Sequence, residues 1–428
     1  MKQTKRISMD VKQRYAAAAA QYAALGIDTE AALRKLARIP ISLHCWQGDD
    51  VRGLETRPDQ GPSGGIMATG NYPGAARTGD ELRADMLAAL RLIPGRKRAN
   101  IHAFYAETGA AVVERDELKP RHFTKWMAWS KANRVPLDFN ATYFAHPKAA
   151  SGFTLSHADK RIRSFWIKHS IACRKIAQAL AENQGCPCVC NFWIPDGCKD
   201  SPADRWSPRA RLIDAYNQIF DPAHKIDTRK CIDTIEPKLF GIGSEDYVVG
   251  SYEFYLGYAL THEQVLCLEM GHFHPTEAIA DKVSALLQYK PSLLIHVSRG
   301  IRWDSDHIVI LNDDLRNVFL ELNRGGALER IYLALDFFDA SVNRIAAWVI
   351  GSRATLKATL IALLEPVKCL QQLERDGDGA GKLALMEELK AMPFGAVWDY
   401  YCAQQGVPAG LEWIEAVRKY ERSVLCCR

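Results

Sequence analysis

The residues best suited to chemistry in this sequence are carboxylates and imidazoles at the ends of apolar, strand-like runs. Five short segments carry them: Thr234–Lys238 with Glu236, Leu266–His272 with Glu269 and His272, Leu294–Ser298 with His296, Arg302–Asp306 with Asp304 and Asp306, and Leu333–Asp339 with Asp336. An isolated ionised carboxylate is costly to bury among apolar residues, whereas groups that share a cation are stabilised there. We therefore expect these side chains to converge around two divalent cations.

The spacing within two of these segments indicates which side chains face the same way. Glu236 and Lys238 are two residues apart on a strand-like run, so both point to one face. The carboxylate could bind a metal ion while the ammonium donates a hydrogen bond to a polarised oxygen; a local ion pair is the alternative. Glu269 and His272 form Glu-x-x-His, which could hold one ion or bridge two, although a single histidine is often a structural residue.

The remaining ligand candidates need a partner for their charge or polarity. Asp304 and Asp306 would repel each other unless a cation lies between them or the loop leaves both solvated. His296 and Asp336 lie among apolar residues, where an imidazole or a charge requires a partner. Together the candidates supply two histidines and five carboxylates. Such oxygen and imidazole ligands favour Mn²⁺, with Mg²⁺, Co²⁺ or Zn²⁺ as possible substitutes.

Strand-like and helical segments alternate through most of the chain. The predicted strands are Ile41–Trp46, Asn100–Tyr105, Leu137–Tyr143, Cys188–Ile194, Cys231–Leu239, Val265–Met270, Ser292–Val297 and Ile331–Phe337. Amphipathic helices are predicted between most of them, such as Glu81–Leu92, His122–Ala132, Ala158–Ala181, Arg209–Phe220, Thr276–Gln288 and Asp314–Leu322. Eight such repeats predict an α/β fold, a (β/α)₈ TIM barrel, whose active face is at the carboxyl ends of the strands. An open nucleotide-binding sheet is disfavoured because no Gly-rich fingerprint follows the first run.

The alternation also predicts three regions. Residues 1–40 form an N-terminal helical segment with helices at Val11–Ala24 and Thr29–Ala37, and residues 41–340 form the catalytic barrel. Residues 341–428 contain only helical patterns and are predicted to be an extension that makes oligomer contacts. At the mouth of the barrel, the aromatic face of Trp193 could pack against sugar C–H groups, although a core tryptophan is an equal alternative.

Composition excludes several other classes of protein. The chain of 428 residues has 48% apolar and 25% charged residues and a formal net charge of +5, without a dense basic run, so we expect no nucleic-acid partner. No stretch is expected to reach the roughly 20 apolar residues that span a membrane. The 12 cysteines follow no disulfide framework, which favours a reduced, cytoplasmic protein.

Several longer motifs resemble one known family over nearly the whole chain. They are HCWQGDDV (His44–Val51), TGNYPG (Thr69–Gly74), IPDG (Ile194–Gly197), KLFGIG (Lys238–Gly243), GHFHPTE (Gly271–Glu277), RWDSDH (Arg302–His307) and LDFFDASVNRIAAWVIG (Leu335–Gly351). These motifs resemble the enteric type of bacterial L-rhamnose isomerase. The Glu-Pro-Lys and Glu-x-x-His motifs are also similar to those of the xylose isomerases, a related family of barrels.

The resemblance implies a homotetrameric, metal-dependent aldose–ketose isomerase that converts L-rhamnose to L-rhamnulose, the first step of rhamnose catabolism. It implies that Glu236, Glu269, His296 and Asp336 hold a structural ion, and that His272, Asp304 and Asp306 hold a catalytic ion. Lys238, His102 and Trp193 would line the sugar. Catalytic roles fall to Lys238, Asp304, Asp306 and Asp336, in a 1,2-hydride shift or, alternatively, in proton transfer through an enediol.

One departure from the family pattern concerns a metal ligand. The family usually has Asp-Ala-Gly-His where this chain has Glu269, Met270, Gly271 and His272. The added methylene moves the carboxylate, and it could change the spacing of the ions or the preferred metal. Two other classes could use parts of this pattern: a metal-dependent endonuclease, which should have more histidines and a basic groove, and a non-catalytic sugar-binding protein, which would not need paired metal sites.

Overall fold

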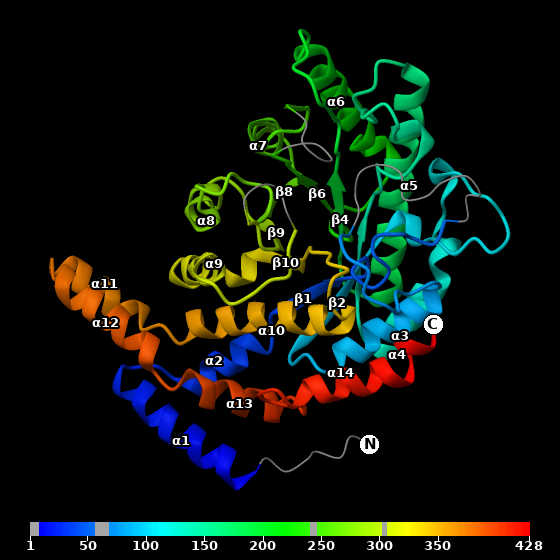
Figure 1. Cartoon of the computed structure of the whole chain (residues 1–428). Helices are drawn as coiled ribbons and strands as arrows, with labels where there is room; N and C mark the ends of the chain where they lie inside the picture. Colours follow the sequence, from blue (N-terminus) through cyan, green and yellow to red (C-terminus); the bar gives the residue numbers. More distant parts are fainter. Residues whose placement is uncertain (1–7, 56–67, 240–245, 302–305) are drawn as a thin grey trace.

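The chain folds around a closed barrel of eight parallel strands (Figure 1). The computed structural model describes residues 8–55, 68–239, 246–301 and 306–428. The barrel strands are β1 (Pro40–His44), β2 (Arg96–His102), β3 (Leu137–Asn140), β4 (Cys188–Trp193), β6 (Cys231–Glu236), β8 (Val265–Glu269), β9 (Leu293–Val297) and β10 (Ile331–Leu335). They follow chain order around the ring, and β1 pairs with β10 to close it. The predicted TIM barrel is therefore confirmed.

Every predicted barrel strand is present, with shifts at the ends. The first strand begins at Pro40 and β2 begins at Arg96, four residues before the predicted start. Seven of the eight strands end one to three residues before the predicted end, and β9 ends at Val297 as predicted. β5 (Gly197–Cys198) and β7 (Tyr247–Val248) form a short antiparallel ladder in loops that follow β4 and β6. This ladder was not predicted.

Helices cover the outside of the barrel. They are α3 (Gly79–Leu90), α4 (Thr124–Asn133), α5 (Lys160–Gln184), α6 (Trp206–Ile219), α7 (Tyr252–Thr261), α8 (Ile279–Leu286), α9 (Asp313–Arg324) and α10 (Arg344–Leu363). Side-chain N-caps fix the start of several of them, such as Thr78 for α3 and Asn312 for α9. α7 was not among the predicted helices, since its apolar residues do not form a single stripe.

The helix α10 closes the helical layer of the barrel. It packs against α9 on one side and α3 on the other, and it also contacts β1 and α2. Its length and hydropathy match a membrane span, but 83% of the apolar window is buried inside the protein. The expectation that no stretch reaches the length and hydropathy of a membrane span was therefore wrong for this one helix. Contacts with barrel elements account for the apolar character of α10.

The remaining helices lie outside this layer (Figure 1). They are α1 (Met9–Ala24), α2 (Thr29–Leu36), α11 (Val367–Arg375), α12 (Gly379–Ala391), α13 (Phe394–Gln404) and α14 (Glu412–Ser423). α1 packs against α13, where the rings of Tyr15 and Tyr400 stack at 3.8 Å. α11 and α12 project from the body. The division at residues 40 and 340 stays a prediction, and the packing of α10 favours a later second boundary.

Candidate active site

Four of the predicted ligands meet at the carboxyl ends of neighbouring strands. Glu236 ends β6, Glu269 ends β8, His296 lies on β9 and Asp336 follows β10. In the sheet register Glu269 lies beside His296, so parallel pairing itself brings these two together. One ligand-type atom from each of the four side chains lies within 4.8 Å of the others. We call this group the carboxylate–imidazole cluster.

The imidazole of His296 lies at the centre of the cluster. Its Nδ1 is 3.3 Å from Glu236 Oε2, 3.1 Å from Asp336 Oδ2 and 3.6 Å from Glu269 Oε2. His296 is 1% exposed and Glu269 is fully buried, so water does not screen these charges. Three carboxylates directed at one imidazole form a donor set of the kind that holds a divalent cation.

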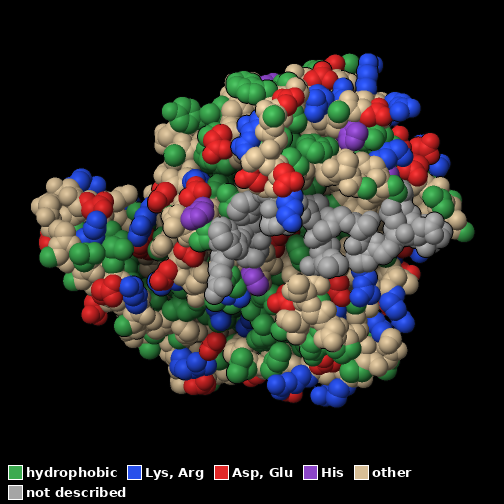
Figure 2. All heavy atoms as spheres, turned by 45° about the horizontal axis from the view of Figure 1, so that its top comes forward, with side chains coloured by type: hydrophobic (Ala, Val, Ile, Leu, Met, Phe, Trp, Pro, Cys, Tyr) green, Lys and Arg blue, Asp and Glu red, His purple; other side chains and the backbone are tan. Residues whose placement is uncertain are grey.

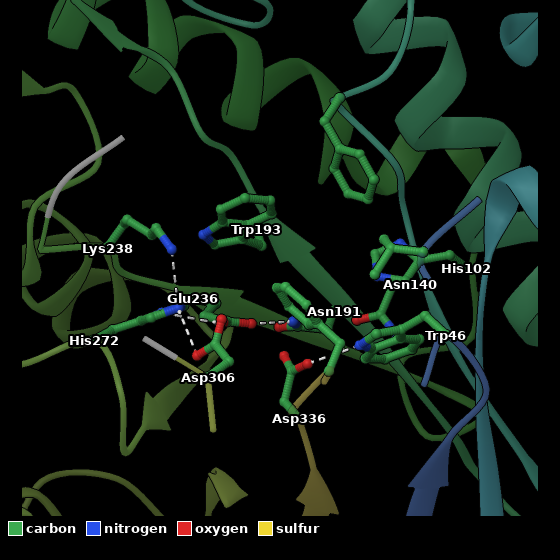
Figure 3. A pocket seen from close by; sticks show the side chains of 13 residues that line it. Trp46, His102, Asn140, Asn191, Trp193, Glu236, Lys238, His272, Asp306 and Asp336 are labelled. Atoms are coloured by element: carbon green, nitrogen blue, oxygen red, sulfur yellow. Dashed lines mark hydrogen bonds and ion pairs between the residues drawn. The ribbon is translucent and has the colours of Figure 1, made fainter. Parts of the chain in front are cut away.

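Protein donors orient each carboxylate of the cluster. The indole Nε1 of Trp46 donates to Asp336 Oδ1 at 3.0 Å, which leaves Oδ2 toward His296. The Ser298 hydroxyl and the Gly271 N–H both donate to Glu269 Oε1. Asn191 Nδ2 donates to Glu236 Oε2 (Figure 3). These partners fix the carboxylates in one orientation, as the surroundings of metal ligands commonly do.

The polar atoms of the cluster fit a cation. Glu269 Oε2 and both ring nitrogens of His296 have no hydrogen-bond partner among the described residues, although all are buried. Burial and the nearby Asp336 raise the pKa of Glu269 well above its usual range. Burial also opposes the charge of Glu236, but His296 and His272 outweigh it and lower the pKa of Glu236. A divalent cation bound between Glu236 and Glu269 would neutralise their negative charge, so that neither carboxylate would need a proton.

A second group of predicted residues lies next to the cluster. His272 Nδ1 donates to the Pro237 carbonyl at 3.0 Å, which leaves Nε2 with a lone pair. That Nε2 is 3.3 Å from Lys238 Nζ and 3.7 Å from Asp306 Oδ1 (Figure 3). Asp304, the predicted companion of Asp306, lies outside the described residues. His272, Asp306 and Lys238 therefore lie together at this end of the barrel.

A cavity opens beside both groups. Its lining residues are Trp46, Val51, His102, Asn140, Phe144, Asn191, Trp193, Glu236, Lys238, His272, Asp306, Asp336 and Phe338. The three predicted substrate contacts, His102, Trp193 and Lys238, are among them. Burial lowers the pKa of His102 to about 3, so the ring is neutral, and its Nδ1 lies 3.2 Å from the Thr142 hydroxyl. Lys238 Nζ lies 4.9 Å from the centre of the Trp193 ring, a cation–π distance.

Sequence reasoning missed several residues of this cavity. Trp46 and Val51 come from the loop after β1, and Asn191 comes from β4. Phe144 and Phe338 add apolar surface. Phe338 lies two residues after Asp336, a spacing that could have indicated it, and Trp46 ended a predicted strand. The other positions carried no local signal, since apolar and amide residues are common throughout the chain.

The fold and the site define a class of protein, a TIM-barrel enzyme with a buried carboxylate–imidazole cluster at the catalytic face. Residues 9–428 match the family model of L-rhamnose isomerase (RhaA). The L-rhamnose isomerase of Rhodopirellula baltica is 54% identical over 420 residues, covering 98% of this chain and 97% of the relative. That of Salmonella paratyphi A is 53% identical over 426 residues, with coverage of 99% and 100%. The chain therefore belongs to the L-rhamnose isomerase family, and the protein is an isomerase.

Solved structures of sugar-converting enzymes are more distantly similar. An L-ribulose 3-epimerase has a TM-score of 0.47 at 13% identity, covering 79% of this chain and 97% of the other. A putative xylose isomerase from Rhodospirillum rubrum has a TM-score of 0.45 at 12% identity, with coverage of 74% and 98%. The closed barrel itself establishes the fold. The family predicted from the sequence motifs is confirmed, whereas the roles of the individual site residues stay predictions.

Proposed function

We propose that this isomerase interconverts L-rhamnose and L-rhamnulose and depends on divalent metal ions. The observation that carries this proposal is the convergence of Glu236, Glu269 and Asp336 on His296 beside a cavity at the catalytic end of the barrel. Family membership supports the substrate. In this reaction a hydrogen moves from C2 to C1, the O2 hydroxyl loses its proton and O1 gains one.

Two sets of side chains would hold the ions. Glu236, Glu269, His296 and Asp336 would hold one ion, and His272, Asp306 and Asp304 would hold a second. Mn²⁺ suits this mixture of carboxylate and imidazole ligands best, with Zn²⁺, Co²⁺ or Mg²⁺ as substitutes. When bound, the ions would polarise the C1 carbonyl and make the C2 hydroxyl more acidic.

The side chains around the cavity would position the sugar and move protons. Lys238, placed between Trp193 and His272, would donate a hydrogen bond to the developing oxyanion. Asp304 and Asp306 would serve the transfer of the O2 proton, and Asp336 would help return it to O1. His102 and Trp193 would flank the sugar. We propose a 1,2-hydride shift rather than an enediol route, because bound ions would stabilise the negative charge that the shift requires.

Preference for a 6-deoxy sugar requires an apolar wall opposite the ions. Val51, Phe144 and Phe338 supply apolar surface in the cavity. Val51 has φ of 59°, an uncommon conformation for a β-branched residue, so the loop after β1 holds it in place against local preference. We assign these three residues to the C6 methyl group.

We further propose a cytoplasmic homotetramer. On the face shown in Figure 2 acidic and basic side chains are interspersed, which disfavours a nucleic-acid partner. The projecting α11 and α12 offer surface for subunit contacts. No membrane partner is proposed, since α10, although apolar, is packed against the barrel.

Removal of metal tests the proposal directly. Protein treated with a chelator and then desalted should lose turnover of L-rhamnose, and added Mn²⁺ should restore it. L-Mannose, which carries a hydroxyl on C6, should be converted less efficiently because the apolar wall cannot satisfy that hydroxyl. Full turnover in the metal-free protein would contradict metal dependence. Reaction in tritiated water that places label at C1 would contradict the hydride shift.

A further inference from the structure

A second cavity occupies the opposite, amino-terminal end of the barrel. Its volume is about 150 Å³, and we call it the N-terminal cavity. It is lined by Pro40, Ser42, Arg98, Asn100, Asp138, Phe139, Pro187, Val189, Asn191, Leu294, His296 and residues 331–334. Pro40 and Pro187 are exposed at its rim, whereas His296 and Asn191 are buried at its inner end. The cavity therefore leads from solvent to the underside of the carboxylate–imidazole cluster.

Small side chains leave this space open. The interior of a TIM barrel is normally filled by layers of bulky branched residues. Here Ser42 on β1 pairs in register with Ala334 on β10, and Ala334 pairs in register with His296 on β9. Two consecutive positions around the ring beside His296 thus carry a serine and an alanine, so the layer below the imidazole is incomplete.

The wall of the N-terminal cavity is partly polar. Arg98 donates to both oxygens of Asp138, each at 2.7 Å, and Ser42 donates to Asp138 Oδ2 at 2.7 Å. Water needs polar partners and about one molecular volume to be retained inside a protein. The N-terminal cavity meets both requirements.

His296 lines this cavity, and Nε2 is the ring nitrogen that is not directed at the three carboxylates. Nδ1 is directed at the three carboxylates, and Nε2 has no hydrogen-bond partner among the described residues although the side chain is 1% exposed. The thiol of Cys267 lies beside the ring and competes with water as its partner. An imidazole that binds a cation through Nδ1 carries its proton on Nε2, and such a proton is normally given to an acceptor that fixes the ring.

We propose that the N-terminal cavity binds ordered water that accepts a hydrogen bond from His296 Nε2 and so holds Nδ1 toward the carboxylates. The proposal rests on the proposed function, because it assigns Nδ1 to a metal ion. Residues at the amino-terminal end of the barrel would thereby orient a metal ligand that acts at the carboxyl end. Ser42 and Ala334 act by being small, since a larger apolar residue at either position would displace the water.

Two substitutions of nearly equal volume distinguish the loss of a hydrogen-bond acceptor for His296 from the mere filling of the cavity. Ala334→Val and Ala334→Thr both fill the space beside His296 and both suit a strand, but only threonine offers a hydroxyl acceptor. Mn²⁺ binding to metal-stripped protein is measured by calorimetry. We expect Ala334→Val to weaken affinity about 10-fold or more, as loss of such support does elsewhere. Ala334→Thr should remain within about 3-fold of the parent, because its hydroxyl replaces the water.

A high-resolution crystal structure provides an independent readout. Water density about 2.7–3.2 Å from His296 Nε2 is expected in the parent and not in Ala334→Val. No water there, equal weakening by Val and Thr, or unchanged affinity in Ala334→Val would each overturn the proposal. A loss of affinity on Cys267→Ala without water density would identify the thiol as the acceptor instead. A parent that fails to bind Mn²⁺ would contradict the proposed function, and the water density would still decide the role of the cavity.

Discussion

At the scale of single residues, the site depends on how buried polar atoms share partners. Asp336 gives one oxygen to the Trp46 indole and turns the other toward His296. Glu269, at a position where the family resemblance predicts the shorter aspartate, has its first oxygen held by Ser298 and the Gly271 N–H. Its second oxygen still reaches His296 at 3.6 Å. The longer side chain is thus accommodated within the cluster.

Loss of the indole donor should weaken the metal site. Trp46→Phe removes the hydrogen bond to Asp336 and keeps an aromatic ring in the cavity. We expect about a 10-fold loss of Mn²⁺ affinity, measured by calorimetry, because Asp336 loses its fixed orientation. Trp206→Phe is the matched control, since Trp206 is 87% exposed and remote from the cavity. Equal affinity in Trp46→Phe and the control would contradict an orienting role.

Neutralising Asp306 should abolish most of the chemistry. Asp306→Asn keeps the shape of the side chain and removes the charge beside His272. We expect turnover of L-rhamnose to fall about 100-fold or more, with an unchanged circular dichroism spectrum. Asp200→Asn, at an exposed position, should leave turnover unchanged. Asp304→Asn is predicted to behave like Asp306→Asn. Near-normal turnover of Asp306→Asn would remove this carboxylate from the mechanism.

At the scale of elements, loops are tied to the barrel by buried polar groups. His169 on α5 accepts a hydrogen bond from the Thr142 N–H through Nε2 at 3.1 Å. Its Nδ1 donates to the Arg115 carbonyl at 3.0 Å. One neutral tautomer therefore joins a helix to two loops, and one of those loops carries Thr142, the partner of His102.

This arrangement predicts a loss of stability in acid. Burial lowers the pKa of His169 to about 4, whereas the unfolded chain has a histidine pKa of about 6.5. Between these values the unfolded state binds more protons than the folded state, so stability falls as pH falls from about 6.5 to 4. The contribution reaches about 3 kcal/mol at the lower end.

Denaturant titrations across this pH range test whether the free energy of unfolding falls as the pH falls. His169→Gln, which cannot take up a proton, should flatten the decrease in the free energy of unfolding below pH 6.5. His262→Gln, at an exposed position, should leave the slope as it is. A parent and a His169→Gln variant with the same pH slope would show that His169 does not contribute.

At the scale of the whole molecule, the C-terminal helices divide into packed and projecting parts. α13 and α14 pack on α1, α3 and α10. α11 and α12 extend from the body, and no described residue of α12 is buried (Figure 1). Leu383 on α12 is 62% exposed. An exposed apolar residue on a projecting helix is a suitable point for contact with another subunit.

Assembly should respond to a charge on α12. Leu383→Glu would place a carboxylate in an apolar contact, so we expect the proposed tetramer to dissociate partly into smaller species. Sedimentation velocity at several protein concentrations measures the change. Leu411→Glu is the control, because Leu411 is 77% exposed but lies outside α11 and α12. Identical sedimentation of both variants and the parent would exclude α12 from the subunit interface.

The sequence alone determined the features that depend on local order. Strand and helix patterns alternate within windows of a few residues, which is sufficient to predict the barrel and the strand ends where Glu236, Glu269 and His296 lie. The tertiary structure decided which groups share partners. Trp46 meets Asp336 from 290 residues away because β1 pairs with β10 to close the ring. Only the pairing of the strands in the closed barrel places the small residues Ser42 and Ala334 beside His296. Nothing in the local sequence distinguishes Ala334 from any other alanine on a strand.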